Sequence, residues 1–187
     1  MSAFEVEKLK LEGSYLIHNF YSGDNRGEFE KFFEREIYAA RGIPFTLNET
    51  FATVSSRNVI RGMHFQINSP QAKLVSVLQG KVWDVIVDLR PDSDTFRQWV
   101  GVELGGDSHK SLYVPRGFAH GFFSLEDKSI MLYQCQGPYH KETDTGIRFD
   151  DPDLGIRWPV SPEAAIHSER DLGLMSFQDY LKNPMKL

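Results

Sequence analysis

The middle of the chain is a succession of short runs of β-branched and apolar residues, each closed by turn-forming residues. Runs of this length and composition are typical of β-strands. Gly105-Gly106, Pro115-Arg116-Gly117 and Glu126-Asp127-Lys128 separate several of them. Many short strands with regular turn signals are typical of a β-sandwich or β-barrel. The sequence therefore predicts an all-β fold whose central strands cover residues 74–79, 82–89, 99–104, 111–114, 118–125 and 130–136.

Within the run 82–89, apolar residues alternate with Asp84 and Asp88. Successive side chains of a strand point to opposite faces, so both carboxylates are predicted on one face. Gly80 and Lys81 precede this run, which predicts a tight hairpin from the strand before it. The opposite, apolar face is expected to consist of Trp83, Val85, Val87 and Leu89.

Two helices are predicted outside the strand-rich region. The first covers residues 30–41 and is capped by Gly42. The second runs from a Ser176 cap through Lys182, with Asp179 in its first turn. We expect both helices to pack on the outside of the sheets. The apolar face of the first would consist of Phe33, Ile37 and Ala40.

Length and charge restrict the classes of protein further. The chain has 187 residues, 41% of them hydrophobic, and no linker-like stretch, which predicts one domain over residues 1–187. A net charge of -5 argues against nucleic-acid binding, although local cations can still hold a small anion. The absence of an apolar leader or spanning run argues against a membrane. Cys135 is the single cysteine, which excludes an intrachain disulfide and suggests a reducing, cytoplasmic location.

Three segments place side chains that could act as acids or bases inside strand-like sequence. An isolated strand histidine such as His64 is more often structural than a base. On an ideal strand Arg61 would point away from it, unless Gly62 introduces a bulge. His120 follows a Pro-Arg-Gly turn that re-aims the chain, either into a cavity or into a backbone hydrogen bond. Tyr133 has apolar neighbours, a setting in which tyrosine usually belongs to the core.

A metal site is a competing interpretation of the histidines. Metal-binding jelly rolls use a His-x-His pair, a glutamate and a later histidine, and only the later element, Pro115-x-Gly117-x-x-His120, is present. His64-Phe65-Gln66 lacks the second histidine, and two histidines without a carboxylate hold a metal poorly. We therefore expect no metal. Nucleophile-elbow, Walker and dinucleotide-binding motifs are also absent from the sequence.

Taken together, the segments resemble the dTDP-4-dehydrorhamnose 3,5-epimerases and related 4-keto sugar-nucleotide epimerases. The resemblance extends from Asp24-Asn25-Arg26-Gly27 to Ser168-Glu169-Arg170-Asp171. Several motifs in the same order are far more specific than any one of them. The densest matches are residues 60–66, 71–75, 84–90 and 114–122, with Asp150-Asp151-Pro152 and Ile156-Arg157-Trp158-Pro159.

The resemblance implies a cupin-like jelly roll, a homodimer, and catalysis without a metal or organic cofactor. It implies that His64 is the general base, that Tyr133 is the proton donor and that Asp171 hydrogen-bonds to the base. The implied substrate is a nucleoside-diphosphate sugar, with dTDP as the nucleotide. Its implied binding residues are Arg26, Glu49, Arg61, Lys73, His120, Tyr139, Asp144 and Arg170.

Epimerisation next to a ketone explains why these residue types are needed. A C4 ketone acidifies the protons at C3 and C5, so a base can remove one of them. Lys73 and His120 can stabilise the enolate oxygen that forms. Inversion requires a proton from the opposite face, which a tyrosine across from the histidine supplies. A carboxylate on the histidine fixes its tautomer and stabilises the imidazolium.

The sequence departs from the family pattern at positions expected near the nucleotide and the sugar. Lys31 replaces a glutamate, Glu49 a glutamine, Phe51 an asparagine, Asp144 a glutamate and Arg170 a lysine. The departures leave open which nucleotide and sugar are used and whether both carbons are inverted. A single-site epimerase, a metal-dependent cupin such as a dioxygenase, and a non-catalytic sugar-binding module are the alternatives.

Overall fold

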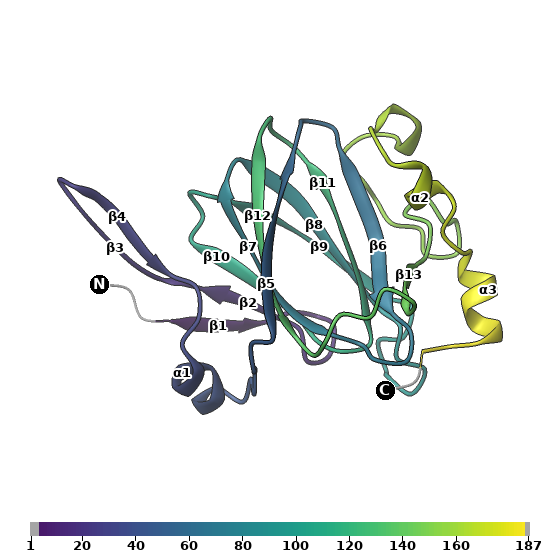
Figure 1. The fold of residues 1–187 in the computed structure, drawn as a ribbon, viewed down its shortest axis with the longest axis horizontal. Coiled ribbons are helices and arrows are strands. Elements are labelled where there is room, and N and C mark those ends of the chain that lie inside the picture. Colours follow the sequence, from purple (N-terminus) through teal and green to yellow (C-terminus); the bar gives the residue numbers. More distant parts are fainter. Residues whose placement is uncertain (1–3, 186–187) are drawn as a thin grey trace.

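The computed structural model describes residues 4–185, which form two facing β-sheets and a projecting hairpin (Figure 1). All strand pairings within the sheets are antiparallel. The first sheet, in spatial order, consists of β1 (Glu5–Lys8), β2 (Tyr15–His18), β10 (Lys110–Val114), β7 (Ala72–Gln79), β12 (Ser129–Gln136) and β5 (Glu49–Ser55). The second consists of β13 (Asp144–Gly146), β6 (Ile60–Gln66), β11 (Phe118–Ser124), β8 (Lys81–Asp88) and β9 (Trp99–Gly105).

The predicted all-β class and the six predicted central strands are confirmed, with bounds shifted by at most two residues. The core between the two sheets contains Val75 and Val77 of β7 and Ile86 of β8. The predicted alternation of β8 is also confirmed, because Val85 and Val87 pack on the other side of that sheet. Asp84 therefore points between the sheets, where it is fully buried.

The tight hairpin predicted at Gly80 and Lys81 is wrong. β7 pairs with β10 and β12, whereas β8 pairs with β9 and β11 in the opposite sheet. Gly80, at a φ of 75°, lies where the chain crosses from one sheet to the other. Since Ser129 stands 2.6 Å from where a Cβ of Gly80 would lie, the glycine serves a close crossing rather than a two-residue turn.

The first predicted helix is shorter than expected. α1 (Arg35–Ala40) begins five residues later, because residues 30 and 31 belong to β4 (Gly27–Lys31), which pairs with β3 (Phe20–Asp24). Glu30 is held there by the Asn19 amide at 2.7 Å. Phe33 precedes the helix, and Tyr38 is the buried side chain of α1. Gly42 follows the helix at a φ of 77°, as its predicted capping role requires.

The C-terminal segment covers the outer face of the five-stranded sheet (Figure 1). It contains a 3₁₀ helix (Pro162–Ala164), α2 (Glu169–Leu172) and α3 (Phe177–Lys182). The Ser176 cap is confirmed, because its hydroxyl accepts from the Asp179 N–H at 3.0 Å. Phe177 and Tyr180 of α3 pack on the sheet. Both predicted helices therefore lie outside the sandwich, since α1 packs on the six-stranded sheet.

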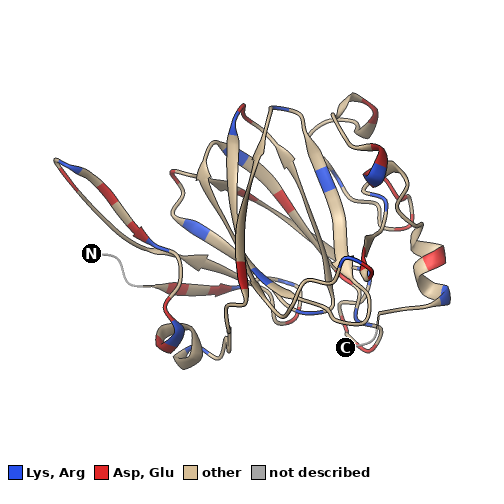
Figure 2. Cartoon of the chain, viewed as in Figure 1, with Lys and Arg blue, Asp and Glu red and all other residues tan. Residues whose placement is uncertain are grey.

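Basic and acidic residues are interspersed along the elements seen in Figure 2. Within residues 4–185, no helix is long and apolar enough to cross a membrane.

Candidate active site

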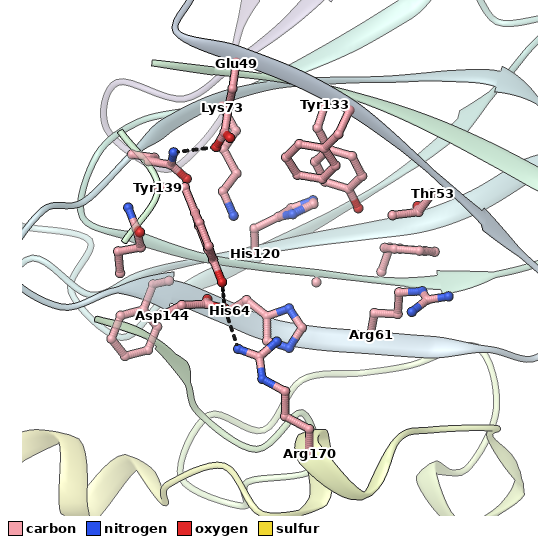
Figure 3. A pocket seen from close by; sticks show the side chains of 16 residues that line it. Glu49, Thr53, Arg61, His64, Lys73, His120, Tyr133, Tyr139, Asp144 and Arg170 are labelled. Atoms are coloured by element: carbon pink, nitrogen blue, oxygen red, sulfur yellow. Dashed lines mark hydrogen bonds and ion pairs between the residues drawn. The ribbon is translucent and has the colours of Figure 1, made fainter. Parts of the chain in front are cut away.

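A cavity of about 400 Å³ lies between the two sheets. That size suits a small organic ligand. Figure 3 shows charged and aromatic side chains from both sheets directed into it. The lining residues are Glu49, Phe51, Thr53, Arg61, His64, Phe65, Gln66, Gln71, Lys73, His120, Gly121, Phe122, Tyr133, Tyr139, Asp144 and Arg170.

His64, on β6, is held by a carboxylate from outside the sandwich. Its Nε2 lies 2.7 Å from Asp171 Oδ1. Burial raises the pKa of Asp171, but His64, the Gly62 N–H and the Ser168 hydroxyl outweigh it, so the net pKa is lowered. An ionised Asp171 keeps a proton on Nε2 and leaves Nδ1 free to accept another. The pair thus has the arrangement of an oriented base.

A bulge in β6 brings Arg61 into the same cavity as His64. His120 pairs with His64 in register, and Phe122 pairs with Arg61, so β6 has one extra residue between the two pairs. Gly62 permits it, with a φ of 132° and with Gly121 Cα 2.6 Å from where a Cβ would lie. The side chains of β6 therefore do not alternate strictly between the two faces of the sheet, and Arg61 and His64 both line the cavity.

Beside His64, a second histidine–carboxylate pair lies deeper. His120 Nε2 is 2.9 Å and 3.0 Å from the two oxygens of Asp84. Burial raises the pKa of Asp84, against the opposing effects of His120 and Lys73. Lys73 points into the cavity near His120 (Figure 3), and burial lowers its pKa. Within the described part of the chain, its ammonium group has no hydrogen bond or ion pair.

Tyr133 lies on β12, across the cavity from His64 (Figure 3). It stacks on Phe51, with ring centroids 4.8 Å apart and an angle of 11°. Its hydroxyl donates to Met131 Sδ at 3.7 Å, a weak acceptor. Burial is the largest cause that raises its pKa, and the charge of Asp84 adds to it. Tyr133 is therefore protonated, with a hydroxyl that has no strong acceptor.

The cavity mouth contains a small polar network. Asp144 Oδ2 accepts from the Tyr139 hydroxyl at 3.1 Å and pairs with Arg170 at 2.8 Å. Deeper in, Glu49 accepts from the Gln71 amide at 2.9 Å. These contacts bring distant parts of the sequence to one opening.

The structure brings together nearly all the residues predicted for the site. His64, Tyr133 and every predicted binding residue except Arg26 line the cavity, and Asp171 contacts it through His64. Arg26 lies instead near the tip of the β3–β4 hairpin, paired with Asp24 and with an 85% exposed side chain. In a single copy of the chain Arg26 therefore does not line this cavity, and its role in substrate binding stays a prediction.

Seven lining residues are absent from the predicted set of catalytic and binding residues: Phe51, Thr53, Phe65, Gln66, Gln71, Gly121 and Phe122. Phe51 and Thr53 follow Glu49 at intervals of two on β5, so they share its face. That spacing is the signal by which the sequence could have revealed them. Cys135 belongs to the buried core, and burial raises the pKa of its thiol to about 11. Among residues 4–185, no group of three or more His, Cys, Asp or Glu side chains is placed to hold a metal.

A β-sandwich with an oriented histidine facing a protonated tyrosine has the features of an isomerase that moves protons on and off carbon. The model of the dTDP-4-dehydrorhamnose 3,5-epimerase family matches residues 8–179, and the chain belongs to this family.

Individual relatives are similar over nearly their whole length. A dTDP-4-dehydrorhamnose 3,5-epimerase of Methanothermobacter thermautotrophicus is 39% identical over 188 residues, covering 100% of both chains. The structure of a 3,5-epimerase from Legionella pneumophila, in complex with dTDP-4-keto-L-rhamnose, is 34% identical with a TM-score of 0.92, covering 99% and 100%. A 3'-monoepimerase from Streptomyces bikiniensis, in complex with dTDP-quinovose, is 30% identical with a TM-score of 0.85, covering 93% and 88%.

Proposed function

We propose that this protein epimerises dTDP-4-dehydro-6-deoxyglucose at C3 and C5, without a metal or organic cofactor. The observation that carries the proposal is the position of the His64–Asp171 pair on one wall of the cavity and Tyr133 on the other. A base and an acid on opposite sides of a bound ring are what inversion at carbon requires.

In this mechanism His64 takes a proton from the carbon next to the ketone, and Asp171 stabilises the imidazolium that forms. The electron pair of the C–H bond moves toward the ketone oxygen and gives an enolate. Lys73 and His120 are placed to stabilise that oxygen. Tyr133 then delivers a proton to the opposite face of the carbon, and the ketone re-forms. Arg61 and Arg170 would bind the diphosphate.

Proton NMR of the substrate in deuterium oxide tests this function. We expect deuterium at both C3 and C5, together with signals of the inverted sugar. The control is His64→Asn, which should slow incorporation by about a thousandfold. Binding without exchange would favour a non-catalytic sugar-binding module. Exchange that disappears after treatment with a chelator and returns with iron, manganese or nickel would favour a metal-dependent enzyme.

A single-carbon epimerase is the second candidate, because a 3'-monoepimerase is among the structural relatives. Phe51, which lines the cavity and stacks on Tyr133, takes the place of an asparagine in the family pattern and makes a narrower reaction worth testing. Exchange at C3 alone in the same experiment would support the single-carbon reaction.

We also propose that the protein is a homodimer in which Arg26 of one copy reaches the cavity of the other. The hairpin that bears Arg26 projects away from its own sandwich (Figure 1), and its Phe29 is 55% exposed. β5 is a free sheet edge beside the cavity, with Val54 62% exposed, and such edges are usually covered. We propose as well that residues 1–187 form a single domain and that the protein is located in the cytoplasm.

Mixing two inactive variants tests the dimer. Arg26→Ala leaves its own cavity intact, and His64→Asn leaves its own hairpin intact. A mixed dimer would contain one site with both native residues, so mixing after mild unfolding and refolding should restore activity. If activity stays at the level of the separate variants, Arg26 does not act across a dimer interface.

A further inference from the structure

Thr53 lies beside Tyr133 on the wall of the cavity. In the pairing of β5 with β12, Thr53 is opposite Met131 and Phe51 is opposite Tyr133. Thr53 and Tyr133 are therefore diagonal neighbours on one face of the sheet. Figure 3 shows the Tyr133 hydroxyl directed toward Thr53.

Both hydroxyl groups lack a strong partner. Thr53 Oγ1 is buried and has no hydrogen-bond partner among residues 4–185. The Tyr133 hydroxyl donates to the Met131 thioether at 3.7 Å and leaves its own lone pairs unused. A buried hydroxyl without a partner destabilises the fold, so its presence beside an acid calls for a role in another state of the site.

We propose that Thr53 is a positioning residue that donates a hydrogen bond to the Tyr133 oxygen once the tyrosine has given up its proton. The inference rests on the proposed epimerisation. In that step the enolate electron pair forms a bond to the proton of Tyr133, the ketone re-forms, and a phenolate remains. The Thr53 hydroxyl stabilises the phenolate until solvent returns a proton to it, while His64 releases the proton of the substrate to solvent.

Most of the groups around Tyr133 disfavour the phenolate, which is why a donor such as Thr53 is needed. Burial, Asp84 of β8 and Cys135 of β12 itself all oppose the phenolate and raise the pKa of Tyr133. His120 of β11 meets the ring at 73° and is engaged by Asp84 through Nε2. The Thr53 hydroxyl, as a hydrogen-bond donor to the phenolate form, and the charge of Arg61 of β6 act in the opposite direction and lower this pKa. The Arg61 Nε already donates to the Ser55 hydroxyl at 3.2 Å.

Thr53→Val, which removes the hydroxyl at nearly constant volume, tests the proposal, and Thr53→Ser, which keeps it, is the control. We expect the valine variant to invert the sugar about tenfold more slowly, with KM unchanged and His64-dependent deuterium exchange preserved. Thr53→Ser should restore inversion. In a Tyr133→Phe background, Thr53→Val should have no further effect. A serine variant as slow as the valine variant, or an equal loss in both backgrounds, would overturn the proposal.

A second measurement needs no substrate. Trifluorotyrosine placed at position 133 has a more acidic phenol, whose ionisation can be followed by fluorine NMR. Thr53→Val should weaken the acidity of that phenol about tenfold. An unchanged acidity would overturn the role of Thr53 even if the enzyme epimerises its substrate. If Thr53→Val makes the phenol less acidic but the protein does not epimerise its substrate, the hydrogen bond from Thr53 to Tyr133 is supported and the proposed function is refuted.

Discussion

On the five-stranded wall of the cavity, each histidine is held by a carboxylate: His64 by Asp171 at 2.7 Å and His120 by Asp84 at 2.9 Å. On the six-stranded wall, Tyr133 donates to a thioether, and Thr53 has no hydrogen-bond partner within residues 4–185. The first wall is fixed before any ligand arrives, as a base that must be aimed requires. The second wall has unused hydrogen-bonding capacity, as suits groups whose charge changes during the reaction.

The two carboxylates of the first wall differ from each other as well. Asp171 receives the Gly62 N–H and the Ser168 hydroxyl in addition to His64, and its pKa is lowered. Asp84 has only His120 and Lys73 to offset complete burial, and its pKa is raised. A histidine partner alone therefore does not decide the charge of a buried carboxylate. The depth of burial and the number of donors around the carboxylate decide it together.

The largest expected effect comes from removing the base on the fixed wall. His64→Asn should slow both deuterium exchange and inversion by about a thousandfold, because general-base catalysis contributes factors of this size. Single-turnover NMR in deuterium oxide measures both rates. His18→Asn is the matched control, since His18 lies on β2 outside the cavity lining. A His64 variant that still exchanges at the native rate would assign the base to another group, with His120 the first candidate.

A smaller and more selective effect is expected on the opposite wall. Tyr133→Phe removes one hydroxyl and keeps the stacked ring, so inversion should fall about a hundredfold while exchange falls much less. The ratio of the two rates in one NMR experiment is the measurement. Tyr113→Phe, on β10 and outside the cavity lining, is the control. Equal loss of exchange and inversion would mean that Tyr133 positions the sugar instead of donating a proton.

The sequence was sufficient for the six central strands, but not for the strands of the first 55 residues or for the division of the strands into two sheets. The period-two pattern of β8 gives the buried face of Val85 and Val87 correctly. The same local pattern cannot distinguish a hairpin at Gly80 from a crossing between sheets, because both place a glycine between two strands. The pairing of β7 with β10 and β12 depends on residues far away in the chain. The start of the first helix was predicted wrongly for a similar reason, because the first two residues of the predicted helix belong to β4 and pair with β3.

For the site, the resemblance identified nine of the residues that line the cavity and the hydrogen bond between Asp171 and His64, but not the other contacts among them. The Asp171–His64 pair joins residues 107 positions apart, and only the fold brings them to 2.7 Å. The sequence allowed a bulge at Gly62 but did not require one. The bulge is present in the structure, where Gly121 packs closely against Gly62. Arg26 matches the family motif but lies on a hairpin that leaves its own cavity, which no local pattern indicates.

The contrast between the two carboxylates predicts opposite effects of pH on stability. The pKa of Asp171 in the folded protein is lowered below 3.8. Its contribution of about 1–2 kcal/mol to the free energy of unfolding is therefore present above that pH and is lost as the pH falls through the pKa of the folded state. Because the pKa of Asp84 is raised above 3.8, folding takes up a proton, and the free energy of unfolding falls as the pH rises toward the folded value.

Chemical denaturation of Asp171→Asn and Asp84→Asn between about pH 3 and pH 7 tests this difference. Relative to each variant, the wild type should gain stability with rising pH against Asp171→Asn and lose it against Asp84→Asn. Asparagine keeps the size of the side chain in both cases, so each variant is the control for the other. Slopes of the same sign would mean that the donors around Asp171 do not separate the two carboxylates.

The smallest expected effect tests whether the second wall also needs to be held in place. Phe51 stacks on Tyr133 at 4.8 Å but is 46% exposed, so its contact orients the ring without burying it completely. Phe51→Ala should slow inversion about fivefold, the size of one aromatic pair, and leave exchange unchanged. Leu181→Ala, on α3 and absent from the cavity lining, is the control, because Leu181 is also an exposed apolar residue. A Phe51 variant that also slows exchange would show that stacking positions the sugar for His64, and the two walls would then not act independently.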